Sequence, residues 1–234
     1  ARHAQPVTIV VADDDAIARA ARAICDGLLV VMPTETVYGL AGDATNASAV
    51  ARIYEAKGRP TFNPLISHIL DIEQAERHGA LHPVAEDLAE AFWPGPLTLV
   101  VRRREESDIS ELACAGLQSV ALRAPAHPVA RALIAAAGTP LAAPSANRSG
   151  RLSPTHAAHA AEDIRDSVAL VLDAGPSVLG LESTVIAVQD DGRATLLRPG
   201  AIARADIERI TGALIAPQAA LKPASPGMLE SHYA

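Results

Sequence analysis

The sequence predicts an α/β protein in which one twisted, mixed β-sheet is flanked by helices. In the first half, short apolar runs of strand length alternate with Ala-rich stretches of helix length. In the second half, the strand-like runs follow one another more directly. Alternation predicts helices packed on the faces of a sheet, whereas the later succession of strands disfavours a purely doubly wound, parallel arrangement.

The first elements have clear boundaries. Residues 7–11 and 28–32 are apolar runs of strand length, and the second is continuous enough to be buried on both faces. Between them, an acidic N-cap among residues 13–15 begins a helix that Asp26-Gly27 ends. Asn46 is positioned to cap a further helix, whose last turn carries Lys57.

The rest of the chain continues this pattern. Further strands are expected at residues 65–69, 97–101, 119–122, 141–143, 169–172, 184–188 and 194–197, and further helices at residues 84–92, 128–137 and 155–164. No internal repeat interrupts residues 1–212, which we expect to form a single catalytic domain. Residues 213–234 are rich in Pro, Ala, Ser and Gly, which predicts the start of an interdomain linker.

Composition excludes several classes of protein. The net charge is 20 − 27 = −7 and aromatic residues make up 3% of the chain, which disfavours both a dedicated nucleic-acid binder and a base-stacking platform. The two cysteines have no CxxC spacing, so neither a zinc site nor a disulfide framework is expected. No run of about 18 apolar residues is present, and we expect a cytoplasmic protein without a membrane partner.

A cationic loop follows the second helix. Lys57-Gly58-Arg59 stands at the end of that helix, before Pro60, Asn63 and Pro64. An ammonium and a planar guanidinium beside a glycine suit phosphate oxygens, which suggests an anion site. The alternative is a solvated helix end whose basic residues complement the helix dipole.

Other polar groups stand at the ends of predicted strands, where open α/β sheets bind ligands. Ser145 and Asn147 follow one strand, although a simple turn and cap would give the same pattern. Arg123 ends a buried strand and must meet an acid, either of the protein or of a ligand. Ser183 begins a strand, and His68 lies within one, where a core histidine is the alternative.

Familiar nucleotide and hydrolase motifs are missing. The chain has no GxxxxGK[ST] loop, GxGxxG turn, GxSxG elbow or HExxH helix. Asp173 and Glu182 are the only acids near the expected sheet ends of the second half, and nothing in the sequence pairs them. The sequence therefore favours electrostatic chemistry, in which a charged substrate is positioned and developing negative charge is stabilised.

Taken together, these segments resemble the YrdC-domain family. The resemblance covers roughly residues 10–210 and rests on PTETVYGL (33–40), KGRPTFNPL with ISH (57–68), WPGPLT (93–98), VALRAP (120–125), PSAN (144–147) and STV (183–185). The threonine-rich segment, followed in order by the Lys-x-Arg and Ser-x-Asn pairs, is highly specific for this family.

The resemblance implies a threonylcarbamoyl-AMP synthase, a nucleotidyltransferase that converts L-threonine, bicarbonate and ATP, with Mg²⁺, into threonylcarbamoyl-AMP and pyrophosphate. The product would pass to a tRNA threonylcarbamoyl transferase complex. Lys57 and Arg59 would be catalytic, and no protein metal site is implied. The family's ATP contacts would fall on Lys57, Arg59, Asn63, Ser119, Ser145, Asn147, Ser153, Arg198 and Tyr233, and its threonine contacts on Thr36, His68, Arg123, the backbone at Ala143, and Ser183.

Two rival functions remain at this stage. A module that binds double-stranded RNA or the ribosome would also use a cationic concave face, although the acidic balance of the chain disfavours stable nucleic-acid binding. A carbamoyl-transfer domain of metallocentre maturation occurs in related but larger chains. The cysteine sets expected for that role are absent here.

Overall fold

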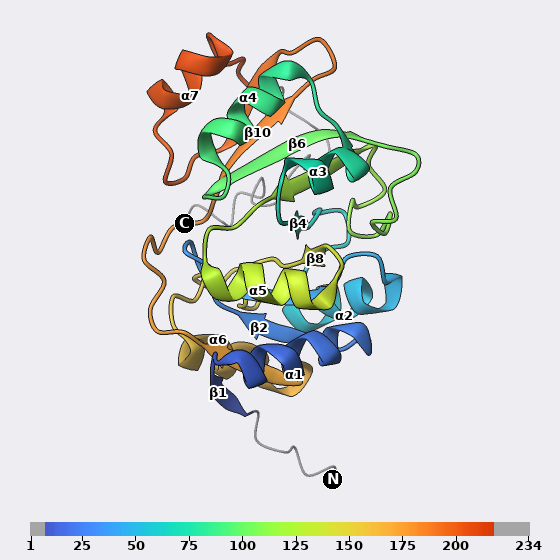
Figure 1. Cartoon of the computed structure of the whole chain (residues 1–234), viewed down its shortest axis with the longest axis vertical. Helices are drawn as coiled ribbons and strands as arrows, with labels where there is room; N and C mark the ends of the chain where they lie inside the picture. The colour runs from blue at the N-terminus through green and yellow to red at the C-terminus, as the bar shows by residue number, and fades with distance from the viewer. Residues whose placement is uncertain (1–7, 218–234) are drawn as a thin grey trace.

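One mixed sheet organises the protein (Figure 1). The computed structural model describes residues 8–217. Its strands are β1 (Ile9–Val11), β2 (Val30–Met32), β3 (Gly39–Asp43), β4 (Ile66–His68), β5 (Gly79–Ala80), β6 (Leu97–Arg103), β7 (Ser119–Arg123), β8 (Leu141–Ala142), β9 (Leu170–Asp173), β10 (Thr184–Val188) and β11 (Ala194–Arg198). The helices are α1 (Asp14–Cys25), α2 (Ala47–Lys57), α3 (Ile72–His78), α4 (Pro83–Phe92), α5 (Pro128–Ala137), α6 (Ala157–Ile164) and α7 (Arg204–Thr211), with a 3₁₀ turn η1 (Arg165–Ser167).

The strand order confirms the mixed α/β prediction. The strands run β1-β9-β2-β3-β8-β4-β7-β6-β10-β11, and β5 pairs with β6 beside this path. Parallel pairs, such as β4 with β7 and β6 with β10, alternate with antiparallel pairs such as β6 with β7. The strands around β4 therefore come from four distant parts of the chain.

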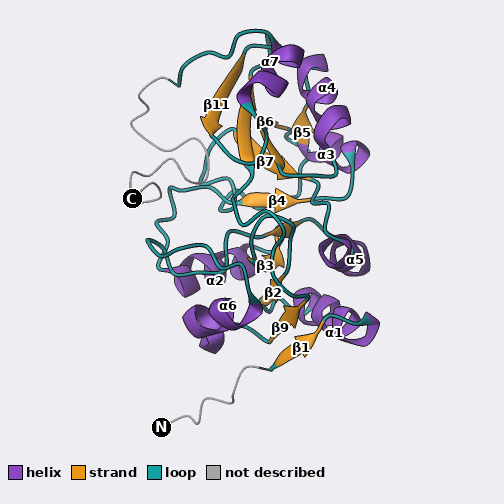
Figure 2. Cartoon of the chain, turned by 90° about the vertical axis from the view of Figure 1, so that its left-hand side faces the viewer, coloured by secondary structure: helices purple, strands orange, loops and turns teal. Residues whose placement is uncertain are grey.

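Helices cover the two halves of the sheet differently (Figure 2). In the half that contains β1, β2 and β9, α1 and α5 lie on one face and α2 and α6 on the other. In the half that contains β6, β7 and β11, helices α3, α4 and α7 all lie on one face. Among residues 8–217, no helix covers the opposite face of this second half.

Local sequence signals explain the ends of the helices. The Asp13 side chain accepts a hydrogen bond from the Ala16 amide and begins α1, as expected. Asn46 caps α2 in the same way, and Gly58 ends α2 with a φ of 58°, in the left-handed region that favours glycine. Because Gly58 turns the chain at this point, Arg59 lies beyond the end of the helix.

The core consists mainly of Ala, Val, Leu and Ile side chains, as the low aromatic content of the sequence indicates. One cluster joins α2 and α4 to the sheet, and a second packs α1 and α5 against β2 and β9. β2 is buried along its whole length, as the continuous apolar run predicted. Among the helices of residues 8–217, none combines the length and apolarity needed to cross a bilayer.

The structure differs from the sequence prediction in several elements. β3 was not predicted, because its sequence, GLAGD, contains two glycines and lacks the β-branched residues typical of strands. α7 was also missed, and the strand expected at 65–69 is confined to Ile66–His68. The linker prediction for 213–234 stays a prediction, because residues 218–234, and Tyr233 with them, lie outside the described residues.

Candidate functional site

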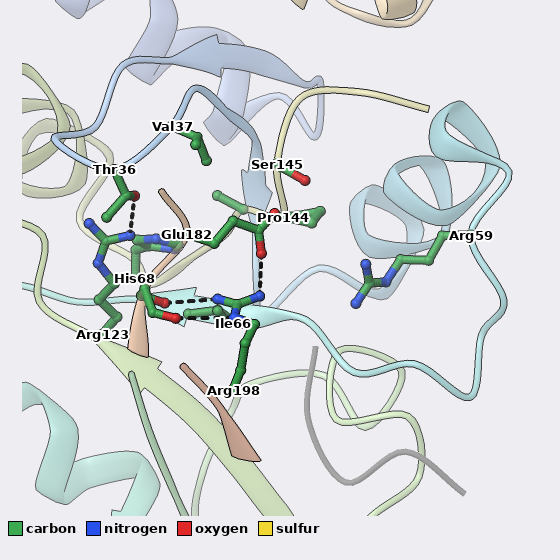
Figure 3. Close-up of a pocket in the computed structure, with 12 residues that line it drawn as sticks. Thr36, Val37, Arg59, Ile66, His68, Arg123, Pro144, Ser145, Glu182 and Arg198 are labelled. Carbon is green, nitrogen blue, oxygen red and sulfur yellow. Dashed lines mark hydrogen bonds and ion pairs between the residues drawn. The ribbon is translucent and has the colours of Figure 1, made fainter. Parts of the chain in front are cut away.

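A cavity opens near the middle of the sheet, where strand and loop residues from seven segments of the chain meet (Figure 3). The space between its walls, including the part open to solvent, is about 440 Å³, and it is lined by Thr36, Val37, Arg59, Ile66, His68, Arg123, Ala143, Pro144, Ser145, Glu182, Ser183 and Arg198. Eight of the residues proposed from the sequence are in this lining, namely Thr36, Arg59, His68, Arg123, Ala143, Ser145, Ser183 and Arg198.

The register of the sheet aligns polar and apolar groups on its helix-free face. His68 pairs with Arg123, and Ile66 pairs with Ala121, in the parallel ladder of β4 and β7. Side chains alternate between the two faces along a strand, so His68 and Ile66 project to the same side. The cavity therefore has a polar end at His68 and Arg123 and an apolar floor beside it.

Arg123 is held on three sides by the protein. Its Nε donates to the Gly95 carbonyl at 3.2 Å, one Nη donates to Thr36 Oγ1 at 2.8 Å, and the other forms an ion pair with Glu35. The second Glu35 oxygen accepts from the amides of Ala126 and His127, which precede α5. The acid that Arg123 requires therefore comes from the protein. Glu35 was not among the residues proposed from the sequence.

Arg198 forms a second arginine–acid pair across the cavity. It pairs with Glu182, and it donates to the Ser183 carbonyl at 3.1 Å and to Ser183 Oγ at 3.0 Å. Ser153 Oγ donates to the other Glu182 oxygen at 2.6 Å, so Ser153 supports the cavity from outside its lining. Ser183 Oγ also lies 2.7 Å from Thr98 Oγ1. The sequence alone identified no partner for Glu182. In the structure its carboxylate orients both Arg198 and Ser153.

Arg59 stands on the side of the cavity opposite Arg123 (Figure 3). Its Nε donates to the Asn63 carbonyl at 3.1 Å and one Nη to the Pro64 carbonyl at 2.8 Å, which folds the loop around the guanidinium. Burial, with a smaller opposing contribution from Tyr54, lowers the Arg59 pKa to about 10. The group stays cationic at neutral pH. Asn63 contributes this carbonyl, while its Oδ1 is buried without a partner in the described structure.

Lys57 lies beside the cavity but is not part of its lining. Its ammonium donates to the carbonyls of Ser145 and Asn147, and Asn147 in turn donates to the carbonyls of Arg148 and Arg151. Burial, followed by repulsion from Arg59, lowers the Lys57 pKa to about 7. In this arrangement Lys57 anchors the 145–147 loop. Its assignment as a catalytic and ATP-binding residue stays a prediction.

His68 is a neutral side chain in the cavity wall. Burial and the neighbouring Arg123 charge lower its pKa to about 3, so the imidazole carries no charge at neutral pH. Its Nδ1 is buried and has no hydrogen-bond partner among the residues described. The neutral imidazole is therefore part of the cavity wall next to Arg123.

Ser119 lies apart from the cavity lining. It is the first residue of β7 and Arg123 is the last, so about 13 Å of strand separates them. Ser119 lines a more open depression on the sheet together with Val100 and Ala187. Within residues 8–217, no cluster of three or more His, Cys, Asp or Glu side chains is arranged to hold a metal ion.

Gly200 supports the Glu182–Thr184 segment by close packing. A Cβ at this position would lie 2.5 Å from the Thr184 amide and 2.6 Å from the Glu182 carbonyl. Gly200→Ala should therefore displace backbone beside Ser183 and lower the free energy of unfolding by about 1–3 kcal/mol, as overpacking does elsewhere. Urea unfolding measures this, and because Gly200 is not among the positive-φ glycines, the loss reports the clash rather than backbone strain. An unchanged free energy of unfolding would contradict the packing argument.

Comparisons with known proteins agree on one family. The Sua5/YciO/YrdC family model, which carries the description telomere recombination, matches residues 22–200. The threonylcarbamoyl-AMP synthases of Bacillus subtilis and Pyrococcus abyssi are 47% and 46% identical, over 95% and 92% of this chain. The crystal structure of P. abyssi Sua5 complexed with L-threonine superimposes with a TM-score of 0.87 at 43% identity, over 92% of this chain and 64% of that one. The chain spans 65% and 64% of the lengths of the two curated relatives. The chain belongs to the Sua5/YciO/YrdC family.

Proposed function

We propose that this protein makes threonylcarbamoyl-AMP and pyrophosphate from L-threonine, bicarbonate and ATP. The observation that carries the proposal is a cavity with cationic groups on opposite sides, Arg123 on one and Arg59 on the other, with Arg198 between them (Figure 3). Cationic groups at separate positions in one cavity can hold two anionic substrates close enough to react with each other. The names of the relatives and the threonine bound to P. abyssi Sua5 support the same assignment.

The amino acid occupies the end formed by Arg123. The guanidinium has five N–H groups, of which three are used by Gly95, Thr36 and Glu35, and two remain for the substrate carboxylate. The hydroxyls of Thr36 and Ser183 and the backbone at Ala143 border the same space. His68 is neutral, so it adds no repulsion toward the substrate amine.

The triphosphate occupies the end formed by Arg59 and Arg198. Planar guanidinium groups suit phosphate oxygens, and Ser145 adds a hydroxyl to this side. Lys57 and Asn147 hold the loop that presents Ser145. From there, the apolar face over Ile66 and Ala121 leads along β7 toward Ser119, a length that an adenosine can span.

The reaction proceeds in two steps on these groups. The neutral threonine amine forms a bond to the carbon of bicarbonate, with loss of water, to give a carbamate. A carbamate oxygen then attacks the α-phosphorus, and the bond to pyrophosphate breaks. Arg59 and Arg198 offset the negative charge that develops on phosphate, and no covalent bond to the enzyme forms. Because the cavity has a single acidic side chain, Glu182, we propose that Mg²⁺ arrives with the phosphates of ATP, whose charge it neutralises.

Ligand binding provides a direct test. ATP and L-threonine together should raise the melting temperature by more than the sum of the shifts that either gives alone, because bound ATP completes the site for threonine. The measurement is a thermal shift assay at fixed Mg²⁺ concentration, with L-valine and GTP as controls. Additive shifts would contradict a shared cavity.

Turnover distinguishes the enzyme from the rival RNA-binding function. Pyrophosphate release should depend on threonine and bicarbonate together, and omission of either should reduce it to background. Absence of release, combined with tight binding of duplex RNA at physiological salt, would overturn the proposal.

A further inference from the structure

Asp163, in the last turn of α6, binds a short turn of the chain that lies beside the cavity. Its Oδ1 accepts from Arg151 Nη1 at 2.5 Å, and its Oδ2 accepts from the Arg148 amide at 3.3 Å. Arg148 Nε also donates to the Asp163 carbonyl, at 3.4 Å. The Asp163 side chain is 13% exposed, although that of Arg151 is 66% exposed. Asp163 therefore connects both ends of the turn formed by residues 148–151 to α6.

Asn147 and Lys57 hold the same turn from the side of the cavity. Asn147 Nδ2 donates to the Arg148 carbonyl at 3.0 Å and to the Arg151 carbonyl at 2.7 Å. Because carbonyl oxygens only accept, both side-chain amide protons of Asn147 are used by this turn. The Ser149 amide donates to the Lys57 carbonyl at 2.9 Å, and the Lys57 ammonium donates to the Asn147 carbonyl. The 148–151 turn is thus held between α6 on one side and the end of α2 on the other.

Residues of the triphosphate end lie on both sides of this turn in the sequence. Ser145 lines the cavity two residues before Asn147. Ser153 follows the turn by two residues and donates to Glu182, which pairs with Arg198. A displacement of the turn would therefore disturb the groups that we assign to ATP, whereas the threonine end has separate supports.

The stability of α6 does not explain an acid at position 163. A negative charge in the last turn of a helix opposes the helix dipole, and α6 has no basic residue in its last turn to offset it. Alanine also has a higher helix propensity than aspartate. Among residues 8–217, both hydrogen-bond partners of the Asp163 carboxylate belong to the 148–151 turn. An exposed ion pair with Arg151 contributes little by itself, so the bond to the Arg148 amide, which orders backbone, is the more informative contact.

We propose that Asp163 is a positioning residue for the triphosphate end of the cavity, because it holds the 148–151 turn in place against Lys57. The proposal rests on the proposed function, since it concerns the ATP half of that site. Asp163 lies outside the cavity lining and acts through the turn. Its charge has a second effect in the same direction. Burial and Arg59 lower the Lys57 pKa to about 7, and Glu182 and Asp163 oppose this shift, so Asp163 favours the cationic form of Lys57.

ATP binding by Asp163→Ala tests the consequence for the site, with Glu162→Ala as the matched control. Glu162 is an exposed neighbour on α6, and both variants remove one negative charge, which by itself would favour an anionic nucleotide. Asp163→Ala should instead raise the Kd for ATP about five- to tenfold, because the turn is no longer ordered before binding. Glu162→Ala should stay within about twofold of wild type. Asp163→Asn keeps one accepting oxygen and should lie between wild type and Asp163→Ala. Calorimetric titration measures these constants.

The kinetic constants separate positioning from a general structural role. Asp163→Ala should raise the KM for ATP by the same factor and leave kcat and the KM for threonine within about twofold of wild type, because the cationic groups of the cavity are unchanged. The melting temperature should change by less than about 3 °C, as expected for loss of one exposed ion pair. Equal losses for ATP and threonine would overturn the proposal, and so would an unchanged or lower Kd for ATP.

Hydrogen exchange of the ligand-free protein tests the contact without any substrate. The amides of Arg148, Ser149 and Arg151 donate to Asp163, Lys57 and the Arg148 carbonyl. They should exchange about tenfold faster in Asp163→Ala, while the amides of α6 keep their rates. Unchanged exchange in the turn, or faster exchange throughout α6, would overturn the proposal. If the wild-type protein bound no ATP, the proposed function would be wrong, and this measurement would still decide whether Asp163 holds the turn.

Discussion

Arg59→Ala should reduce the rate of threonine- and bicarbonate-dependent pyrophosphate release by about 100-fold or more, since removing one preorganised charge-stabilising group commonly has an effect of this size. Arg59 lines the cavity on the side opposite Arg123 and stays cationic after burial. Its bonds to the carbonyls of Asn63 and Pro64 fix its orientation before the substrate binds. The loss should appear in kcat as well as in the KM for ATP. Steady-state kinetics with a pyrophosphate-coupled assay measures both.

Two controls separate chemistry from stability. Arg77→Ala removes an exposed arginine whose partner, Glu73, is also exposed, and should leave turnover unchanged. Arg59→Lys retains a positive charge but lacks the paired N–H donors of the planar guanidinium, so it should recover only part of the activity. If Arg59→Ala lost only stability and kept its kcat, Arg59 would be a structural residue and the proposed phosphate contact would be wrong.

Much of this site could be predicted because its polar groups interrupt apolar patterns. Arg123 ends a strand whose middle three residues are apolar, His68 follows the apolar pair Leu65-Ile66 by two residues, and Ser145 and Ser183 stand near the ends of strands. The alternation of apolar runs predicted the succession of strands and helices along the chain. In open α/β sheets, ligands bind beside the carboxyl ends of the strands. The grouping of these residues around one cavity follows from that alternation.

The partners within the site could not be predicted from sequence. Glu35 reads as one polar residue in a loop, and its contact with Arg123, 88 positions away, depends on the pairing of strands that are distant in sequence. The hydrogen-bond partners of the Lys57 ammonium could not be predicted either, because a lysine at the end of a helix can bind either phosphate or backbone carbonyls. Periodicity reports which side of an element is buried, but it does not identify the atoms that a buried side chain meets.

Glu35→Gln should lower the free energy of unfolding by about 3–5 kcal/mol, the usual result of removing one partner from a buried ion pair. The Arg123 and Glu35 side chains are 4% and 12% exposed, so solvent screens the pair weakly. Glutamine keeps the shape but has only one accepting oxygen. Its amide would face either Arg123 or the amides of Ala126 and His127, donor against donor. Urea unfolding at neutral pH measures the loss.

The pH dependence of unfolding adds an independent check. Burial raises the Glu35 pKa, but Arg123 and the surrounding hydrogen bonds outweigh burial, and the folded pKa lies below the ordinary value of 4.5. The pair therefore contributes its full stability above about pH 4.5 and loses it as the pH falls through the folded pKa. Glu35→Gln should flatten this part of the stability profile. An unchanged acid profile would show that another carboxylate dominates it.

A double-mutant cycle then distinguishes the ion pair from the rest of the loop. Arg123→Met alone leaves Glu35 buried without its cation, and Glu35→Gln alone leaves Arg123 without its anion, so each single variant retains an uncompensated group. The double variant has neither, and it should be more stable than the sum of the single losses predicts by about 1–3 kcal/mol. Additive losses would mean that Glu35 stabilises the protein chiefly through the start of α5. In that event Arg123 would depend on Gly95 and Thr36 alone for its position, and the substrate carboxylate would be the anion that neutralises it.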